Sequence, residues 1–204
     1  KIPPELREAT RSLPFDNDEF MNGLGVSKLA CEKGYSAYEC MWYRPTLDCN
    51  GITGGYTGKG AKTIIPSEAS AKLSMRLVAN QNPSLIAEQC KEYIRTLIPQ
   101  HIELKFEDNY AHCFPANVDM TVAPIKAAKR ALETAFNVKP VFQGEGGSIP
   151  VVADFKRLLG IDTILMGLNL ADDKIHSPNE QFSLKNYQRG IIASAEFMYE
   201  MARQ

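Results

Sequence analysis

A histidine in the short stretch 175–180 is the first residue of this chain that could do chemistry. His176 follows an apolar run at 163–168 that is typical of a buried strand, and a helical pattern comes after it. Open α/β sheets bind ligands in loops at the carboxyl ends of their strands. Asp172 and Asp173 stand just upstream, and a carboxylate behind an imidazole is common at metal ligands and general bases. We therefore expect His176 to bind metal or move a proton. The alternative is a loop histidine with only a local hydrogen bond.

A second candidate site is the glycine-rich segment 144–150. Its glycines and Ser148 precede a helical pattern, where free backbone N–H groups can bind an anion or a carbonyl. Ser148, an aspartate at 172–173 and His176 also stand in the chain order of an α/β-hydrolase triad. However, proline replaces the last glycine of the nucleophile elbow Gly-x-Ser-x-Gly. A capped helix, a ligand-binding loop and a serine hydrolase all remain open on this pattern.

Arg76 lies on the polar side of an alternating pattern at 68–78, which predicts a strand with one apolar face. Its planar guanidinium suits bidentate binding of a carboxylate, although a surface or ion-paired arginine is the alternative. The glycine-rich stretch 54–60 does not predict a nucleotide site. Thr53 and Gly60 replace the glycine and the magnesium-binding hydroxyl of a phosphate loop.

Composition argues against nucleic-acid and membrane surfaces. The formal charge is −1 with mixed signs, and no apolar run approaches the ~18 residues of a membrane span. The five cysteines are widely spaced and form no Cys-x-x-Cys pair, so we expect reduced thiols and a cytoplasmic location. The sequence begins at Lys1 without an initiator methionine, as expected of a processed chain or a fragment.

The elements that must position these residues fall into three segments. Residues 1–45 predict a helical arm, with helices at 3–13, at 17–24 behind a capping Asp16, and at 37–42 behind a capping Ser36.

The second segment, residues 46–118, predicts a small α+β layer. Strands are expected at 46–52, 62–65, 68–78 and 101–106, with a helix at 83–97. The layer would be ferredoxin-like if one opening strand–helix unit were missing.

The third segment, residues 119–204, alternates helix and strand. Helices are expected at 122–136, from 150 to 159 and at 184–202, with strands at 140–142 and 163–168. This βαβ pattern predicts parallel strands that join a larger sheet, because two strands do not make a stable open sheet.

Six motifs, in this order, resemble one family. They are Trp42–Ile52, Gly54–Gly58, Lys62–Pro66, Met75–Val78, Gly144–Pro150 and Ile175–Glu180. From about Trp42 the chain resembles the carboxyl-terminal half of metallopeptidase family 20. That family holds carnosine and Cys-Gly dipeptidases, aminoacylase, acetylornithine deacetylase and succinyl-diaminopimelate desuccinylase, and the dipeptidase branch is nearest.

The resemblance implies a catalytic α/β domain with two divalent ions, zinc or manganese, and an inserted ferredoxin-like lid that makes a homodimer contact. It implies that a metal-bridging water, helped by a glutamate base, hydrolyses a dipeptide or an N-acyl amino acid. The arm at 1–45 would belong to the lid region, 46–118 would form the lid and dimerisation domain, and 119–204 would be the last part of the catalytic domain.

Residue by residue, His176 corresponds to the family's last metal-ligand histidine, and Arg76 to the residue that binds the substrate's terminal carboxylate. Thr63 corresponds to a lid residue near the substrate that reaches toward the partner subunit's site. The other implied substrate-binding positions are Glu145, Gly147 and Ser148 in the pocket loop, and His112, around which the sequence diverges.

One departure from the family is large. Its other metal ligands, its glutamate base and the lid histidine that polarises the carbonyl precede the start of this sequence. A catalytic ion needs about three protein ligands, so His176 alone cannot hold one. We therefore expect a fragment that is inactive without a missing amino-terminal half. The alternatives are a non-catalytic lid and dimerisation piece, and a metal-free serine hydrolase that uses Ser148 and His176.

Overall fold

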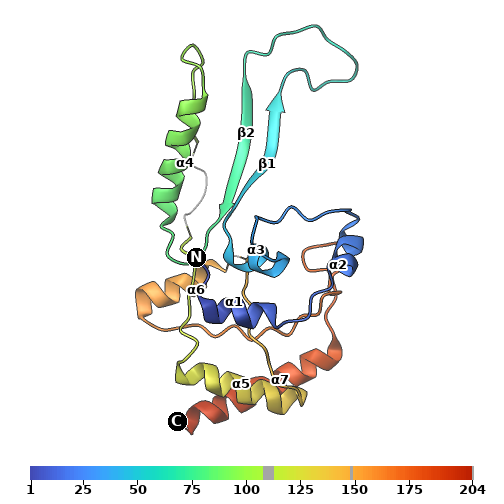
Figure 1. The fold of residues 1–204 in the computed structure, drawn as a ribbon, viewed down its shortest axis with the longest axis vertical. Helices are drawn as coiled ribbons and strands as arrows, with labels where there is room; N and C mark the ends of the chain where they lie inside the picture. Colours follow the sequence, from blue (N-terminus) through green and yellow to red (C-terminus); the bar gives the residue numbers. More distant parts are fainter. Residues whose placement is uncertain (108–112, 148, 204) are drawn as a thin grey trace. The chain divides into compact units, whose positions relative to one another are not determined.

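A computed structural model describes residues 1–107, 113–147 and 149–203. The chain forms two compact units, Lys1–Ala116 with Gln143–Ala153, and Asn117–Phe142 with Asp154–Gln204. Within the described residues, none of the helices has the length and apolar character needed to cross a membrane. The elements (Figure 1) are α1 (Pro4–Arg11), α2 (Asn17–Leu24), α3 (Ala37–Tyr43), β1 (Thr46–Gly54), β2 (Ala69–Arg76), α4 (Pro83–Leu97), α5 (Ala123–Phe136), α6 (Pro150–Asp154), the π-helical turn η1 (Phe155–Leu159) and α7 (Leu184–Ala202).

The three helices predicted for the amino-terminal arm are confirmed as α1, α2 and α3. Asp16 caps α2 by accepting hydrogen bonds from the N–H groups two and three residues on, and Gly25 ends it with a φ of 68°. Ser36 and Glu39 form a capping box at the start of α3. Both caps are local sequence signals, which explains why these helices could be predicted.

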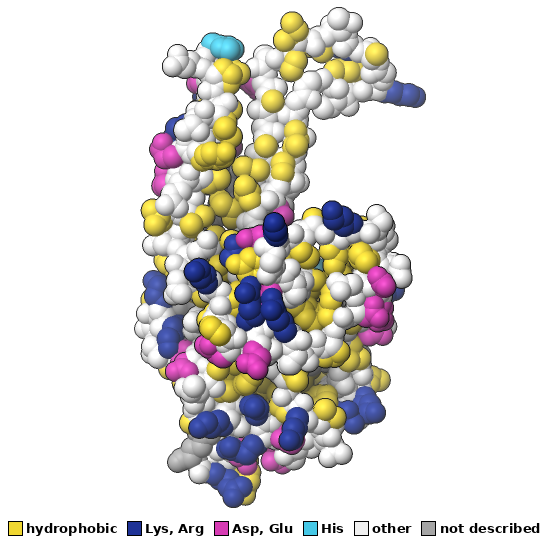
Figure 2. Space-filling view, viewed as in Figure 1, with side chains coloured by type: hydrophobic (Ala, Val, Ile, Leu, Met, Phe, Trp, Pro, Cys, Tyr) yellow, Lys and Arg dark blue, Asp and Glu magenta, His cyan; other side chains and the backbone are white. Residues whose placement is uncertain are grey.

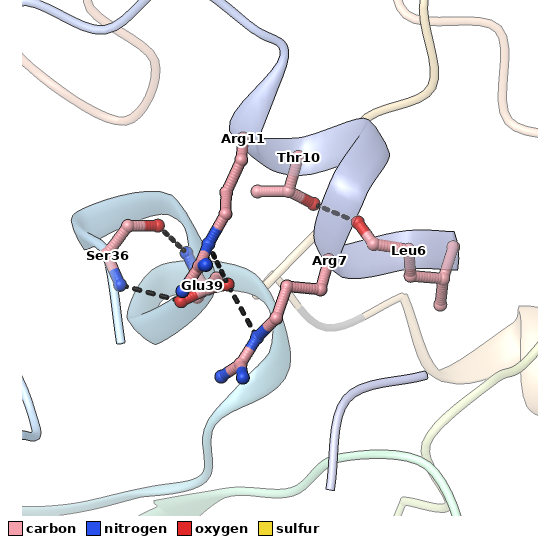
Figure 3. Close-up of polar contacts among 6 residues, drawn as sticks. All are labelled: Leu6, Arg7, Thr10, Arg11, Ser36 and Glu39. Atoms are coloured by element: carbon pink, nitrogen blue, oxygen red, sulfur yellow. Dashed lines mark hydrogen bonds and ion pairs between the residues drawn. The ribbon is translucent and has the colours of Figure 1, made fainter. Parts of the chain in front are cut away.

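A buried carboxylate joins α3 to α1 (Figure 3). Glu39 is fully shielded from solvent, and its Oε1 lies 2.9 Å from Arg7 Nε and 3.1 Å from Arg11 Nε. Its Oε2 accepts a hydrogen bond from Ser36 N–H at 2.7 Å. Burial raises the pKa of the Glu39 carboxyl, but the hydrogen bonds and the two guanidinium charges outweigh burial, so this pKa lies below its usual value.

A series of aromatic contacts, the aromatic ladder, runs from Phe20 and Phe15 to Tyr43 at the end of α3. The Phe15 ring lies 5.2 Å from that of Phe20 and 4.5 Å from that of Tyr38. Tyr38 stacks on Trp42 at 4.2 Å, and Trp42 meets Tyr43 edge-on at 6.3 Å. Such ring pairs each contribute about 0.5–1.5 kcal/mol beyond their buried area. Phe15 meets α3 at Tyr38, so the ladder and the Glu39 ion pairs both anchor the first turn of α3, and the stacked rings continue along the helix.

Strands β1 and β2 form an antiparallel two-stranded ribbon. Leu47 pairs with Met75, and Cys49 pairs with Leu73, so these side chains share one face of the ribbon. This apolar face is accessible, since Ile52 is 79% and Leu73 is 42% exposed. Figure 2 shows hydrophobic side chains along the ribbon.

A bulge in β1 keeps the two faces distinct. Cys49 pairs with Leu73 and Gly51 pairs with Lys72, so the register skips Asn50. Side chains alternate along a strand, and without this extra residue Ile52 would turn to the polar face.

The predicted helix at 83–97 is confirmed as α4. Asn82 caps it by accepting a hydrogen bond from Leu85 N–H at 3.2 Å, and Pro83 occupies the first turn. Half-buried residues recur at helical spacing along α4 (86, 87, 90 and 94).

In the second unit, α5 and α7 pack together through small residues. Ala127, Ala131 and Ala193 are fully buried, and Gly190 is buried on α7. A Cβ added at Gly190 would lie 2.5 Å from a methyl carbon of Leu168, so the Leu168 side chain rests on this part of α7. The predicted helices at 122–136 and 184–202 are therefore confirmed.

Four predicted strands are wrong. Among the described residues, the segments 62–65, 101–106, 140–142 and 163–168 form no strand. A strand exists through hydrogen bonds to a neighbour, and the ribbon is the one strand pairing in the described chain. The predicted helix from 150 to 159 forms as two pieces, α6 and η1.

Candidate functional site

Arg76 and the glycine-rich loop come together in the first unit. Arg76 ends β2, and its Nη1 donates a hydrogen bond to the carbonyl oxygen of Gly146 at 2.9 Å. These residues are 70 positions apart in the chain. The guanidinium thus lies beside a glycine-rich backbone, and the expectation that Arg76 and the loop serve one binding site stays a prediction.

The loop is seated against α3. A Cβ added at Gly146 would lie 2.3 Å from the carbonyl oxygen of Met41, and one at Gly144 would lie 2.6 Å from Trp42 Cβ and 2.7 Å from Tyr43 Cζ. Distances below 3.0 Å cannot be accommodated without movement, so both positions require glycine. The last turn of α3 therefore sets the course of the loop.

The loop is also closed on itself. Glu145 Oε1 accepts a hydrogen bond from Gly147 N–H at 2.6 Å, which turns the carboxylate toward the backbone. Glu145 and Gly147 are exposed. Ser148, the third predicted residue of this loop, lies outside the described residues, as does His112.

Thr63 is not brought to Arg76 within this chain. It is exposed in the connection between the strands, beyond the end of the ribbon at which Gly54 pairs with Ala69. Arg76 stands at the opposite end, beside Thr46. At about 3.3 Å per residue, the length of β2 alone separates the two ends by roughly 23 Å. The predicted reach of Thr63 toward a partner subunit's site stays a prediction.

His176 is exposed on a loop of unusual backbone conformation in the second unit. Lys174, His176 and Asn179 all have positive φ, at 54°, 60° and 62°. Non-glycine residues rarely adopt this region, and such strain persists where the surroundings enforce it.

Asp173 helps to hold the loop of His176 in its backbone conformation. It is 2% exposed, and its Oδ2 accepts a hydrogen bond from Leu170 N–H at 2.8 Å. Its carbonyl oxygen accepts from Gln181 N–H at 2.9 Å, which closes the base of the loop. Asn186 on α7 donates to the Leu168 carbonyl at 2.9 Å and holds the incoming segment. The imidazole is thus displayed to solvent on a braced backbone.

The donor set fits one ligand of a metal site. His176 is accessible, and imidazole nitrogen suits zinc better than manganese, which prefers oxygen ligands. No group of three or more His, Cys, Asp or Glu residues that could hold an ion occurs in the described part of the chain. Asp173 directs its carboxylate to the backbone, and no hydrogen bond joins it to His176 among the described contacts. The Ser–Asp–His hypothesis therefore gains no support from Asp173.

Sequence reasoning missed the residues that hold the site together. The Gly146 carbonyl, the seat on Met41 and Tyr43, and the Glu39 ion pairs were not predicted. One signal was present, since Arg7 and Arg11 are four residues apart and so share a face of α1. A backbone carbonyl has no side-chain signature, so its role could be found only in three dimensions.

Comparison with known proteins finds a matching family model and similar sequences. The peptidase dimerisation domain of the M20 family matches residues 7–102. The chain is 29% identical to human Beta-Ala-His dipeptidase over 95% of its own length and 38% of that protein. It is 33% identical to a Cys-Gly metallodipeptidase of Candida albicans over 78% of its own length and 33% of that protein. The chain thus spans well under half of these curated relatives.

Two solved structures resemble the chain over nearly its whole length. One is an M20 family metallo-carboxypeptidase from Sulfolobus solfataricus, with a TM-score of 0.82 and 28% identity over 98% of this chain and 46% of that one. The other is human carnosine dipeptidase 1, with a TM-score of 0.80 and 27% identity over 100% of this chain and 44% of that one.

Proposed function

This chain is homologous to the metallopeptidases of the M20 family and carries their dimerisation domain, and from that premise we propose that it is part of a metal-dependent dipeptidase or amidohydrolase. Its substrates would be dipeptides or N-acyl amino acids, and its cofactors two divalent ions, zinc or manganese. The observation that carries the proposal is the contact of Arg76 with the glycine loop. In this contact a guanidinium, a group suited to binding a carboxylate, lies beside the segment that we expect to line the substrate pocket.

We assign His176 to the metal site. Divalent ions, when bound, polarise a scissile carbonyl and lower the pKa of water. The contribution of this chain is one exposed imidazole on a braced loop. The remaining ligands and the general base would come from enzyme outside residues 1–204, and the chain would be inactive without them. The limited coverage of the relatives supports this division.

We assign Arg76 to the substrate's terminal carboxylate, and Glu145, Gly147, Ser148 and His112 to the rest of the pocket. Thr63 would reach a partner subunit's site across a homodimer formed through the lid. The family of the dimerisation domain and the accessible apolar face of the ribbon support this homodimer. A cytoplasmic location is proposed from the cysteine pattern.

Metal analysis of the full-length enzyme tests the function. His176→Ala should lower the bound divalent metal per protomer and reduce dipeptide turnover at least about a hundredfold, since catalytic ions rely on very few protein ligands. His101→Ala, at an exposed histidine in a turn, is the matched control and should change neither quantity. Unchanged metal content and turnover in His176→Ala would remove the basis for the metal assignment.

Paired substrates test Arg76. Arg76→Ala should raise KM about ten- to a hundredfold for a dipeptide with a free terminal carboxylate, because it removes a charge-assisted hydrogen bond. The same dipeptide as its terminal amide should respond weakly. Arg95→Ala removes an exposed arginine paired with Glu92 on α4 and serves as the control. Equal losses on both substrates would contradict the role of Arg76.

A further inference from the structure

We propose that Gly146 is a positioning residue for Arg76. Its backbone carbonyl, held against the last turn of α3, fixes the direction in which the guanidinium faces the substrate carboxylate. The inference rests on the proposed function of Arg76 and goes beyond it, because it transfers part of substrate recognition to a backbone atom and to the helix that supports this atom.

The hydrogen bond from Arg76 Nη1 to the Gly146 carbonyl is the first step of the argument. A guanidinium is planar and carries five donors in a fixed arrangement. Directing one of these N–H groups therefore orients the whole plane. Arg76 is an exposed, long side chain with many rotamers, and a contact that selects among them prepares it for a bidentate ligand.

The seat of the loop is the second step. The Gly146 backbone lies against the Met41 carbonyl, and the Gly144 backbone lies against Trp42 and Tyr43. These three residues belong to the last turn of α3. The carbonyl that binds Arg76 is therefore supported by a helix rather than by loop residues alone, and sites supported by helices are positioned more accurately.

The anchoring of α3 is the third step. Glu39 ties the first turn of α3 to α1 through Arg7 and Arg11, and the stacked rings of Tyr38 and Trp42 run along the helix toward its end. All of these contacts lie within the first unit. A continuous series of contacts thus leads from a buried ion pair to the residue that we assign to the substrate carboxylate.

The test compares Gly146→Ala, Arg76→Ala and the double variant in the full-length enzyme, with a free-carboxylate dipeptide and its amide. The added methyl of Gly146→Ala meets the Met41 carbonyl and must displace the loop. We expect KM for the free acid to rise about tenfold, with kcat within about twofold and the amide nearly unaffected. The double variant should lose no more than Arg76→Ala alone, since both changes remove one interaction.

The control is Gly23→Ala on α2, where an added methyl meets nothing within 4 Å and φ is not positive. It should leave both substrates unchanged. Equal KM increases of Gly146→Ala on acid and amide would overturn the proposal, and so would losses that multiply in the double variant.

Failure of the proposed function is separable from failure of this inference. If Arg76→Ala affects acid and amide equally, the role of Arg76 in substrate binding fails. The thermal unfolding midpoints of the same three variants then still report whether Gly146 and Arg76 interact. Non-additive midpoints support the contact, and additive midpoints refute it.

If Gly146→Ala does not fold, Tyr43→Ala provides a second test of the same proposal. It removes one wall of the loop's seat and adds no atoms. We expect the same selective rise in KM for the free acid, of about threefold, with little change in kcat. An unchanged KM for the free acid would overturn the proposal.

Discussion

A single buried carboxylate, that of Glu39, organises the arm of the first unit. It accepts one hydrogen bond, from Ser36 N–H, at the start of α3 and lies beside two guanidinium groups from α1. Removing one partner from a buried ion pair is destabilising, because the remaining charges lose their compensation. Arg7 and Arg11 keep partial access to water, so the penalty is smaller than for a fully buried pair.

Unfolding measurements across pH test Glu39. Because its folded pKa is lowered, the carboxylate contributes stability above its unfolded pKa, and that contribution disappears as the pH falls through the folded value. Glu39→Gln should cost about 1–3 kcal/mol at pH 7, and the difference from the parent should shrink below about pH 4. Glu32→Gln, at an exposed ion pair with Arg44, should cost less than about 1 kcal/mol. A pH-independent loss in Glu39→Gln would contradict the electrostatic account.

The candidate site could be predicted in part at this scale. Arg76, Glu145 and Gly147 were selected for their types and motifs, and the described structure brings them into one unit near Gly146. The sequence predicted that Asp172 or Asp173 would stand behind the imidazole ring of His176. Asp173 instead supports the loop through the Leu170 backbone. The sequence could show that a carboxylate precedes His176, but not which atom this carboxylate binds. Its partner depends on a turn in which Lys174, His176 and Asn179 have positive φ, and none of these residues is the glycine that would have predicted such a turn.

At the scale of elements, helices could be predicted and most strands could not. α2, α3, α4 and α7 begin behind capping residues, and a helix satisfies its hydrogen bonds within one segment. A strand depends on a neighbour that is remote in sequence. The run at 163–168 has the apolar composition of a buried strand, yet it forms none among the described residues. The local pattern therefore indicates that a segment favours the extended conformation, but it does not indicate which segment could pair with it.

The ribbon bulge supplies a prediction at this scale. Deleting Asn50 should cost about 1 kcal/mol or less, because Leu47, Cys49 and Ile52 keep their face and their partners. Deleting Ser74 from β2 is the comparison. It makes Leu73 and Met75 sequence neighbours, which cannot share a face, and should cost several times more. Thermal unfolding followed by circular dichroism distinguishes the two, and equal losses would contradict the assigned register.

At the scale of the whole molecule, the predicted fold class is confirmed. The chain matches solved M20 enzymes over nearly its full length, and its small ribbon with helices fits a dimerisation lid. The sequence motifs indicate the family only from about Trp42, yet the dimerisation domain matches from residue 7.

The connection between the two strands has a practical consequence. Residues 55–68 leave the ribbon at the end farthest from Arg76, and all of them are solvent-accessible. The entropy of closing a loop grows slowly, by about 0.6 kcal/mol for each doubling of its length. Extra residues can be inserted here with little cost to folding, so a label placed at this tip should leave the ribbon intact while it interferes with the reach that we propose for Thr63.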